Sequence, residues 1–282
     1  MYKIVAKKEL SPQIKEFVVE APLIARNASP GQFVILRLDE LGERFPLTIA
    51  DFDRERQTIT LIFQELGHST RRLGLLEEGE SILDVVGPLG LPSHIAKYTD
   101  TVICVGGGIG AAPVFPLARA FKQAGNKVIS IIGARSAGLL IFEQRLAAVS
   151  DLLLIATDDG SKGQRGFVTE LLQQVINSGE KIALVMAIGP VIMMRAVAET
   201  TRPHQIKTMC SLNPIMLDGT GMCGACRVTV GGKVKFACVD GPDFDAHQVD
   251  FGELMLRQRM YRSQEGKAPP AAEETCGGRC TC

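Results

Sequence analysis

The chain has 282 residues, and its 31 Lys and Arg balance its 31 Asp and Glu, so the formal net charge is zero. A neutral chain gives no indication of a nucleic-acid partner or of an anionic membrane surface. Its longest apolar run, 182–194, is too short to span a bilayer. Eight cysteines and no evident secretory signal predict a cytoplasmic protein that uses thiols for metal or redox chemistry.

Residues 1–97 predict an all-β domain. Short apolar segments are separated by Gly, Pro and charged residues, and they follow one another closely, as in a barrel or a sandwich. These segments are 3–10, 14–22, 31–38, 45–52, 58–66 and 81–90. We expect an antiparallel β-barrel.

Residues 98–205 show a different pattern, in which apolar strands alternate with helical periodicity. This alternation predicts a Rossmann-like parallel sheet with right-handed crossovers. The expected strands are 101–105, 127–134, 152–159 and 181–190, and the expected helices are 113–125 and 166–179. No internal repeat is visible.

A glycine-rich loop follows the first strand of this sheet. It matches the G-x-G-x-x-G/A pattern at a strand-to-helix junction, where a dinucleotide pyrophosphate binds to helix amides. The loop consists of Gly106, Gly107, Gly108, Ile109, Gly110 and Ala111. A purely structural glycine turn is the alternative. After the second strand, Arg135 takes the place of the usual acidic ribose ligand. It could accept a 2′-phosphate, stack on adenine or face solvent.

Residues 206–262 contain a cysteine hairpin, within the segment DGTGMCGACRVTVGGKVKFAC. Segments 227–230 and 233–236 alternate at period two around Gly231-Gly232, which predicts a two-residue primed turn. In that register Cys226 lies opposite Ala237 and Cys238 lies opposite Ala225. The two thiols are then close enough for a small metal or a cluster to bridge them.

The spacing of the cysteines favours an iron–sulfur site. Cys223 and Cys226 form a C-x2-C pair, and Asp218 stands where a plant-type ferredoxin loop has its first thiolate. Zinc sites usually repeat two such knuckles, and this chain has one. A zinc ribbon and incidental thiols remain alternatives, and these residues alone leave the role of Asp218 open.

Three features complete the C-terminal part of the chain. A polar–apolar helix is expected at 251–264, and 263–282 are expected to form a flexible tail. Cys276, Cys280 and Cys282 in that tail are either disordered thiols or ligands at a partner interface. Cys210 is a substitute ligand or an ordinary strand residue.

The barrel sequence resembles that of the ferredoxin-NADP reductase superfamily, whose R-x-[PY]-[LI]-[ST] stretch holds FAD. The matching residues are Arg44, Phe45, Pro46, Leu47 and Thr48. The resemblance implies that Arg44 pairs with the FAD pyrophosphate and that Pro46, Leu47 and Thr48 line the isoalloxazine, with Thr48 as the catalytic residue.

Two further segments carry the same resemblance. The stretch Gly67, His68, Ser69 and Thr70 matches the second flavin segment, which binds phosphate at a helix start. An ordinary N-cap at Ser69 or Thr70 is compatible with this role. Gly189, Pro190 and Met193 match the C-G-P-x-x-M motif beside the nicotinamide, although Ile188 replaces its Cys. Asp158 and Asp159 either contact the nicotinamide ribose or form a turn.

A barrel, a nucleotide domain and a terminal [2Fe-2S] hairpin, in that order, resemble the electron-transfer subunit of two-component dihydroorotate dehydrogenases. They are still more similar to the small subunit of NADH-dependent reduced ferredoxin:NADP oxidoreductases, also described as sulfide dehydrogenase subunits. The matching segments are RFPLTIAD, TDDGSKGQRGFVTELL, AIGPVIMMRAV and SLNPIMLDGTGMCGACRV. In that family one Asp and three Cys hold the cluster, which implies the ligands Asp218, Cys223, Cys226 and Cys238.

The resemblance implies a route for electrons from NAD(H) to FAD. From FAD the electrons pass one at a time through the cluster to a larger subunit similar to the glutamate synthase small chain. That partner has its own FAD, [4Fe-4S] clusters and NADP site, and the pair couples NADH, NADPH and ferredoxin by electron bifurcation. The resemblance implies that the chain uses NAD(H), and this implication outweighs the indication of NADP that Arg135 gives. Alternatives are a dihydroorotate dehydrogenase subunit, in which Cys is expected at position 218, and a non-catalytic NAD or redox sensor.

Overall fold

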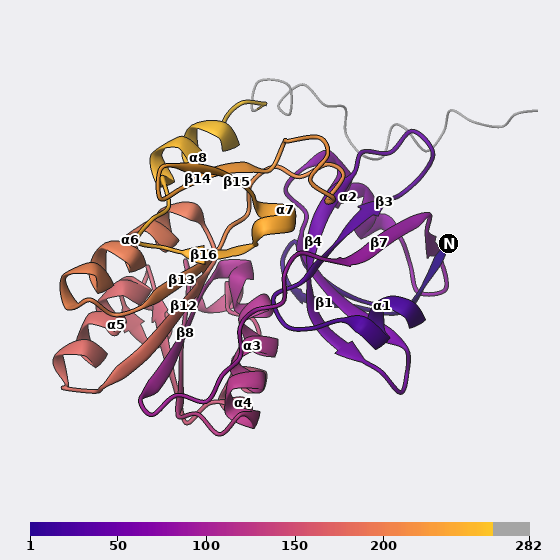
Figure 1. Cartoon of the computed structure of the whole chain (residues 1–282). Helices are drawn as coiled ribbons and strands as arrows, with labels where there is room; N and C mark the ends of the chain where they lie inside the picture. The colour runs from indigo at the N-terminus through magenta and orange to yellow at the C-terminus, as the bar shows by residue number, and fades with distance from the viewer. Residues whose placement is uncertain (262–282) are drawn as a thin grey trace, which may run out of the picture.

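The computed structural model describes residues 1–261 and shows a barrel, a parallel sheet and a C-terminal hairpin module (Figure 1). Cys276, Cys280 and Cys282 therefore lie outside the described residues. Among residues 1–261, no helix combines the length and the hydropathy needed to cross a membrane.

The N-terminal strands form a seven-stranded antiparallel sheet in the order β6-β1-β2-β5-β4-β3-β7. Its two edge strands, β6 and β7, are separated by one residue, so the sheet nearly closes on itself and confirms the expected barrel. The strands are β1 (Tyr2–Ser11), β2 (Ile14–Glu20), β3 (Phe33–Arg37), β4 (Phe45–Asp53), β5 (Thr58–Gln64), β6 (Ser81–Ile82) and β7 (Asp84–Leu89). Inside, the rings of Phe17 and Phe63 meet edge to face at 5.0 Å.

Two short helices accompany the barrel. Helix α1 (Pro22–Asn27) was not expected from the sequence, because six residues show too little periodicity to stand out. Pro22 suits its first turn, where no amide donor is needed. Helix α2 (His68–Leu75) begins at the predicted flavin segment.

The second sheet is parallel except at one edge, in the order β11-β10-β9-β8-β12-β13-β16, and confirms the Rossmann-like expectation. Its strands are β8 (Thr101–Gly107), β9 (Val128–Ala134), β10 (Leu152–Thr157), β11 (Gln164–Arg165), β12 (Ile182–Ile188), β13 (Thr208–Ser211) and β16 (Asp243–Asp245). The chain builds outward from β8 to β10 and then returns to β12 on the other side of β8. This reversal is the point at which ligands bind in open α/β sheets.

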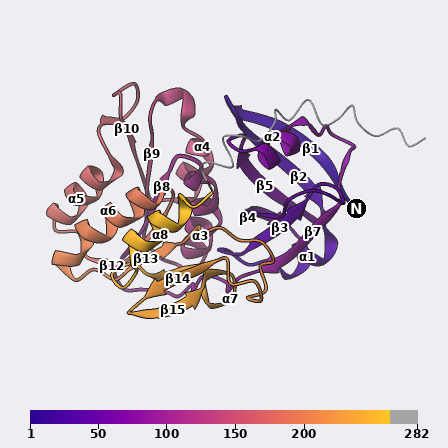
Figure 2. The same ribbon diagram turned by 90° about the horizontal axis from the view of Figure 1, so that it is seen from above.

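Helices cover both faces of this sheet (Figure 2). Alternate β12 residues face opposite sides: Leu184 and Met186 pack toward α3 and α4, whereas Val185 and Ala187 pack toward α5 and α6. The helices are η1 (Gly108–Gly110), α3 (Ala111–Gln123), η2 (Ala137–Leu139), α4 (Glu143–Val149), α5 (Val168–Asn177), α6 (Val191–Thr201) and η3 (Arg202–His204).

The C-terminal hairpin joins β14 (Arg227–Val230) to β15 (Lys233–Phe236) in the expected register, with Val230 opposite Lys233. Gly231 and Gly232 both have positive φ, 58° and 71°, as a type I′ turn requires.

One detail of the hairpin prediction was wrong. After Phe236 the chain turns into α7 (Ala237–Asp240), so Cys238 lies on a helical turn and not opposite Ala225. The closing helix α8 (Phe251–Gln258) is also shorter than the expected 251–264.

The C-terminal module shares a core with the other two parts. Strands β13 and β16 extend the parallel sheet, with Cys210 opposite Phe244. The same buried cluster contains Ile35 from the barrel, Val105 from β8, and the two module cysteines Cys226 and Cys238. The thiols are therefore anchored in a core to which all three parts contribute.

His247 links this module to α6 through a hydrogen-bonded contact with Thr201. Its Nε2 lies 2.9 Å from Thr201 Oγ1, and Thr208 Oγ1 donates to the same hydroxyl at 2.7 Å. Burial, assisted by the charge of Arg202, lowers the pKa of His247. Because the unfolded chain then binds this proton more readily, the stabilisation that neutral His247 contributes is fully present above the unfolded pKa of about 6.5 and declines as pH falls below it.

We therefore expect the melting temperature of the wild type to fall more between pH 7.5 and pH 5.5 than that of His247→Gln. Thermal unfolding followed by circular dichroism at a series of pH values measures this difference. Equal pH dependence in the two proteins would show that His247 does not contribute.

Candidate functional site

The glycine loop lies where β8 and β12 separate, at the carboxyl end of the parallel strands. Gly106 and Gly107 end β8, and Gly108–Gly110 form the turn η1 before Ala111 opens α3. An open α/β sheet binds its ligand at this point, and the first helix amides face it.

The loop is interlocked with the segment that follows β12. A Cβ on Gly107 would lie 2.3 Å from Met193 Sδ, and one on Gly110 would lie 2.2 Å from the Ile188 carbonyl oxygen. By contrast, a Cβ on Gly108 would meet nothing within 4 Å, although its φ of +55° favours glycine. The loop is therefore packed on the Ile188–Met193 side and open at Gly108, where a ligand can approach the backbone.

Arg135, Asp158 and Asp159 lie at the same edge of the sheet, beyond the next two strands. The Asp158 amide donates to the Ala134 carbonyl and the Asp159 amide donates to the Arg135 carbonyl. All three side chains are exposed, and Arg135 makes no side-chain ion pair or hydrogen bond within residues 1–261. The three residues are on the β9 and β10 side of the glycine loop, and Pro190 and Met193 are on the β12 side.

Asp159 also forms the turn that the sequence left as an alternative. The amide and the hydroxyl of Ser161 donate to its Oδ1 at 2.9 and 2.6 Å. These bonds hold the pKa of the Asp159 carboxyl below its usual value.

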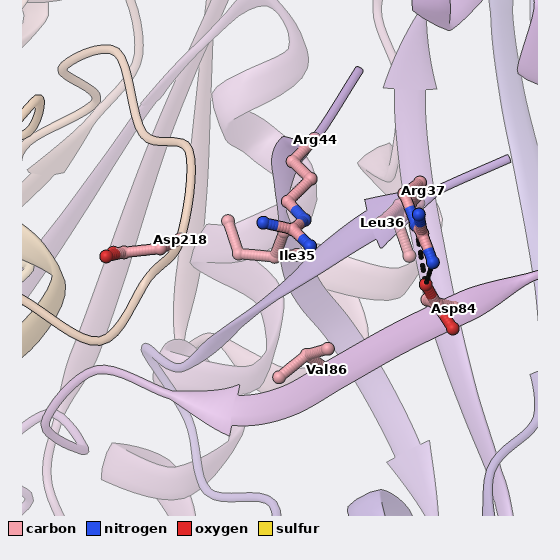
Figure 3. A pocket seen from close by; sticks show the side chains of 7 residues that line it. All are labelled: Ile35, Leu36, Arg37, Arg44, Asp84, Val86 and Asp218. Carbon is pink, nitrogen blue, oxygen red and sulfur yellow. Dashed lines mark hydrogen bonds and ion pairs between the residues drawn. The ribbon is translucent and has the colours of Figure 1, made fainter. Parts of the chain in front are cut away.

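In the barrel, the stretch Phe45, Pro46, Leu47 and Thr48 forms the first half of β4 and pairs with β3. Arg44 precedes it and is exposed, and its guanidinium has no ion pair among the described residues. It lines a cavity of about 220 Å³ in which the other arginine, Arg37, is already paired with Asp84 at 2.6 Å (Figure 3). An unpaired guanidinium beside a cavity suits an anionic group such as a diphosphate.

The second flavin segment forms the N-terminus of α2. The N-cap is Gly67, and the prediction of Ser69 or Thr70 as N-cap was wrong. Thr70 is instead the third helical residue and accepts a 3.1 Å hydrogen bond from the Gly67 amide. Ser69 donates its hydroxyl to Glu43, which directly precedes Arg44. These contacts bring the two predicted phosphate-binding segments together.

The two buried cysteines of the module form a close pair. The sulfurs of Cys226 and Cys238 lie 3.1 Å apart, and each side chain is 2% exposed. Burial raises the pKa of the Cys238 thiol to about 12, and the neighbouring Cys226 adds to the rise. Two sulfurs at this separation are placed to share one metal atom.

Asp218 and Cys223 form a second pair in the loop before the hairpin. The Thr220 amide donates to Asp218 Oδ1 at 2.9 Å, and the Cys223 amide donates to Oδ2 at 2.8 Å. These two bonds hold the pKa of the Asp218 carboxyl below its usual value. The Cys223 side chain is exposed.

The two pairs fit a two-iron cluster. Within residues 1–261 no three His, Cys, Asp or Glu side chains are grouped as ligands of a single metal ion. A [2Fe-2S] cluster needs no such group, because its four ligands are divided between two irons. A buried dithiol pair and a loop pair are therefore a suitable donor set for two irons.

The loop that contains Asp218 and Cys223, which we call the cluster loop, packs directly on the barrel. No sequence signal indicates this contact. A Cβ on Gly219 would lie 2.6 Å from a Leu89 methyl and 2.9 Å from Ile35. Asp218 consequently lines the same cavity as Arg44, together with Ile35 and Val86, and its carboxylate points away from Arg44 (Figure 3).

The other two described cysteines lie in the sheet. Cys210 is fully buried in β13, with its thiol 3.8 Å from the Met194 carbonyl oxygen. Cys104 is fully buried in β8, where burial raises the pKa of its thiol to about 12. Both are strand residues that contribute to the core.

Comparison with protein families identifies two domains. Residues 213–250 match the iron-sulfur cluster binding domain of dihydroorotate dehydrogenase B, and residues 104–199 match the oxidoreductase NAD-binding domain. These ranges contain the cysteine hairpin and the glycine loop.

Individual proteins match over nearly the whole chain. A "dihydroorotate dehydrogenase B (NAD(+)), electron transfer subunit homolog" of Thermotoga maritima is 46% identical, over 93% of this chain and 92% of that protein. The corresponding electron transfer subunit of Bacillus cereus is 33% identical, over 87% and 96%. A solved structure of NADH-dependent reduced ferredoxin-NADP oxidoreductase, described in terms of flavin-based electron bifurcation, is 43% identical over 98% of both chains, with a TM-score of 0.91.

These matches agree with the geometry of the site. The chain is an oxidoreductase with an NAD-binding domain, an iron–sulfur domain and the fold of the flavin-dependent ferredoxin-NADP reductases. It belongs to the family of the dihydroorotate dehydrogenase B electron-transfer subunits and their homologues.

Proposed function

We propose that this chain is the NAD(H)-, FAD- and [2Fe-2S]-containing subunit of a bifurcating NADH-dependent ferredoxin:NADP oxidoreductase. The observation that supports this most strongly is the cavity that Arg44 and Asp218 share. It brings the flavin segment of the barrel beside the cluster loop, so that electrons have a short path between them.

The chain's own residues bind and orient the dinucleotide. The amides from Gly107 to Ala111 hold its pyrophosphate at the start of α3. Pro190 and Met193, on the β12 side of the loop, face the nicotinamide. We place Arg135, Asp158 and Asp159, on the other side of the loop, toward the adenosine end.

On the barrel, Arg44 and the α2 segment Gly67–Thr70 hold the flavin phosphates, and Pro46, Leu47 and Thr48 line the ring. When bound there, FAD would supply both two-electron and one-electron redox chemistry, which would match a two-electron nucleotide to a one-electron cluster. Thr48 lies on β4 opposite Phe33, so its backbone position is fixed by the sheet.

Asp218, Cys223, Cys226 and Cys238 hold the cluster. Apolar side chains surround the loop and face solvent: Met222 is 88% exposed, Leu217 48% and Val239 42%. Such an exposed patch beside Cys223 is the expected docking surface for a partner. We propose a larger subunit that carries flavin and iron–sulfur centres and binds NADP(H) and ferredoxin, in a cytoplasmic complex.

The second candidate is the electron-transfer subunit of a two-component dihydroorotate dehydrogenase, because relatives carry that name. To decide, the chain is purified anoxically from its source together with the subunits that accompany it. NADP reduction by NADH and reduced ferredoxin supports the first function, and dihydroorotate-dependent NAD reduction supports the second. If NADH does not bleach the flavin absorption at all, the chain is a binding protein and both assignments fail.

Replacing Arg44 with glutamine is expected to lower the FAD content of the purified chain. The guanidinium is the cavity's unpaired cation, and a charge-assisted hydrogen bond is worth about 1.5–3 kcal/mol, which corresponds to a roughly ten- to hundredfold weaker affinity. Flavin fluorescence during titration of the flavin-free protein with FAD measures the dissociation constant. Arg71→Gln, an exposed arginine on α2, is the control; equal affinities in all three proteins would contradict the role of Arg44.

Replacing Asp218 with cysteine is expected to preserve the cluster and to make its midpoint potential more negative. Thiolate donates more charge to ferric iron than carboxylate does, and ligand replacement shifts such potentials on the order of 100 mV or more. Electron paramagnetic resonance during an anoxic redox titration gives the potential. An unchanged potential would mean that Asp218 does not ligate iron.

A further inference from the structure

Six side chains form a continuous series of contacts between the barrel and the nucleotide domain. The series begins and ends at barrel carboxylates and passes through two arginines and two phenylalanines of the other domain. We call it the interdomain latch; it consists of Asp51, Arg119, Phe115, Phe142, Arg145 and Glu16.

The first end of the latch joins α3 to β4. Arg119 donates from Nη1 and Nη2 to the two carboxylate oxygens of Asp51, at 3.2 and 2.5 Å. The guanidinium also lies over the Phe115 ring, 5.0 Å from its centroid. A two-point guanidinium–carboxylate contact fixes direction as well as distance.

The second end repeats this arrangement between α4 and β2. Arg145 donates to both oxygens of Glu16, at 2.6 and 3.0 Å, and lies 4.4 Å from the Phe142 ring centroid. Glu16 is only 8% exposed, so this pair is screened less by salt than a surface pair.

The two phenylalanines connect the ends. Phe115 and Phe142 meet edge to face with centroids 5.6 Å apart, and each is 8% exposed. Phe142 has a φ of 62°, a conformation that is rare for a bulky residue and persists only where surrounding contacts maintain it. Its ring contacts with Phe115 and Arg145 are such contacts.

The latch connects the elements that carry the two proposed cofactor sites. β4 carries Thr48 and, three residues later, Asp51. α3 begins directly after the glycine loop and carries Arg119. The two elements pack against each other, as both views show (Figures 1 and 2). The angle between α3 and β4 therefore sets where a bound nucleotide lies relative to a bound flavin.

Apolar burial alone does not set this angle. Ile14, Ala50 and Ile62 of the barrel are buried in the same cluster as α3 residues and hold the domains together. Burial of this kind is non-directional and tolerates small rotations. The two bidentate pairs, at separate points of the interface, remove that freedom.

We propose that the latch residues are positioning residues for hydride transfer, which fix the nicotinamide side of the nucleotide domain against the flavin side of the barrel. This inference rests on the proposed function. None of the six residues belongs to the proposed cofactor sites, and each acts through α3, α4, β2 or β4.

The test uses the full chain with its cofactors. Arg119→Gln/Arg145→Gln breaks both ion pairs and retains most of each side chain. The single variant Asp51→Arg breaks the ion pair between positions 51 and 119. The reciprocal exchange Asp51→Arg/Arg119→Asp restores an ion pair there and serves as the rescue. Lys122→Gln is the matched control, because Lys122 is on α3 but pairs with Asp151 inside the nucleotide domain, at 2.6 Å.

Two measurements are made. Anoxic stopped-flow absorbance follows flavin reduction at increasing NADH concentration. We expect the limiting rate of the double variant to fall at least about tenfold, since misplacement near 1 Å can cost about a hundredfold. The NADH concentration that gives half of the limiting rate stays within about twofold of the wild type, and so does the flavin content, because the binding residues are intact. Hydrogen–deuterium exchange in 45–53 and 111–123 becomes faster in the double variant and not in Lys122→Gln.

An unchanged limiting rate in the double variant overturns the proposal. So does a loss of rate that is matched by loss of flavin, because that result indicates a general folding defect. Recovery of the rate by the reciprocal exchange supports the proposal. If NADH does not reduce the flavin of the wild type, the proposed function fails. Unchanged hydrogen–deuterium exchange in the double variant then separately rejects the latch.

Discussion

Replacement of Cys238 by serine is expected to remove the iron–sulfur cluster while the flavin remains bound. The Cys226 and Cys238 sulfurs are 3.1 Å apart in a core, so serine at position 238 removes one of two paired thiol ligands. The iron content should fall from about two atoms per chain toward zero. Iron and acid-labile sulfide analysis, with visible absorption for the flavin, measures both quantities.

The control for this experiment is Cys210→Ser. Cys210 is equally buried but lies on β13 with its thiol toward the Met194 carbonyl. The iron content of Cys210→Ser should therefore match that of the wild type. Full iron content in Cys238→Ser would contradict the proposed ligand set. Zinc in place of iron in the wild type would support the zinc-ribbon alternative.

Replacement of Gly110 by alanine is expected to abolish most NADH-dependent flavin reduction. Gly110 has an ordinary helical φ of −61°, so the effect is steric and not conformational. Its new Cβ would lie 2.2 Å from the Ile188 carbonyl oxygen, and one of the two interlocked loops has to move. A displaced pyrophosphate cradle should lower kcat/KM for NADH roughly a hundredfold.

Steady-state kinetics with an artificial electron acceptor measures this loss. Dithionite should still bleach the flavin and the cluster of Gly110→Ala, because both proposed sites lie outside the loop. Gly138→Ala is the control, since a Cβ there meets nothing within 4 Å and its activity should be unchanged. Normal NADH kinetics in Gly110→Ala would place the nucleotide elsewhere.

Local patterns in the sequence were sufficient for much of the fold. Period-two alternation around Gly231-Gly232 predicted both hairpin strands and their register. The glycine loop was predicted at the end of β8, because the turn from a buried strand to a helix has a recognisable spacing. Short elements such as α1 were missed, because six residues carry little periodic signal.

The composition of the candidate site was also visible in the sequence, but its assembly was not. Asp218 and the three cysteines follow a known spacing, and the Arg44 stretch resembles a flavin motif. The sequence did not indicate that Asp218 and Arg44 line one cavity, or that Cys238 reaches Cys226 from a helical turn.

The sequence by itself therefore determined the order of the three modules, the strand and helix types and the residues available for cofactors, since these depend on neighbours a few positions away. The tertiary structure alone decided the position of Cys238 on a helical turn, the contact of Gly219 with the barrel and the interdomain latch. Arg119 and Asp51 are 68 residues apart in the chain, and Arg145 and Glu16 are 129 apart. Contacts over such separations arise only when whole domains pack together, and no local periodicity encodes them.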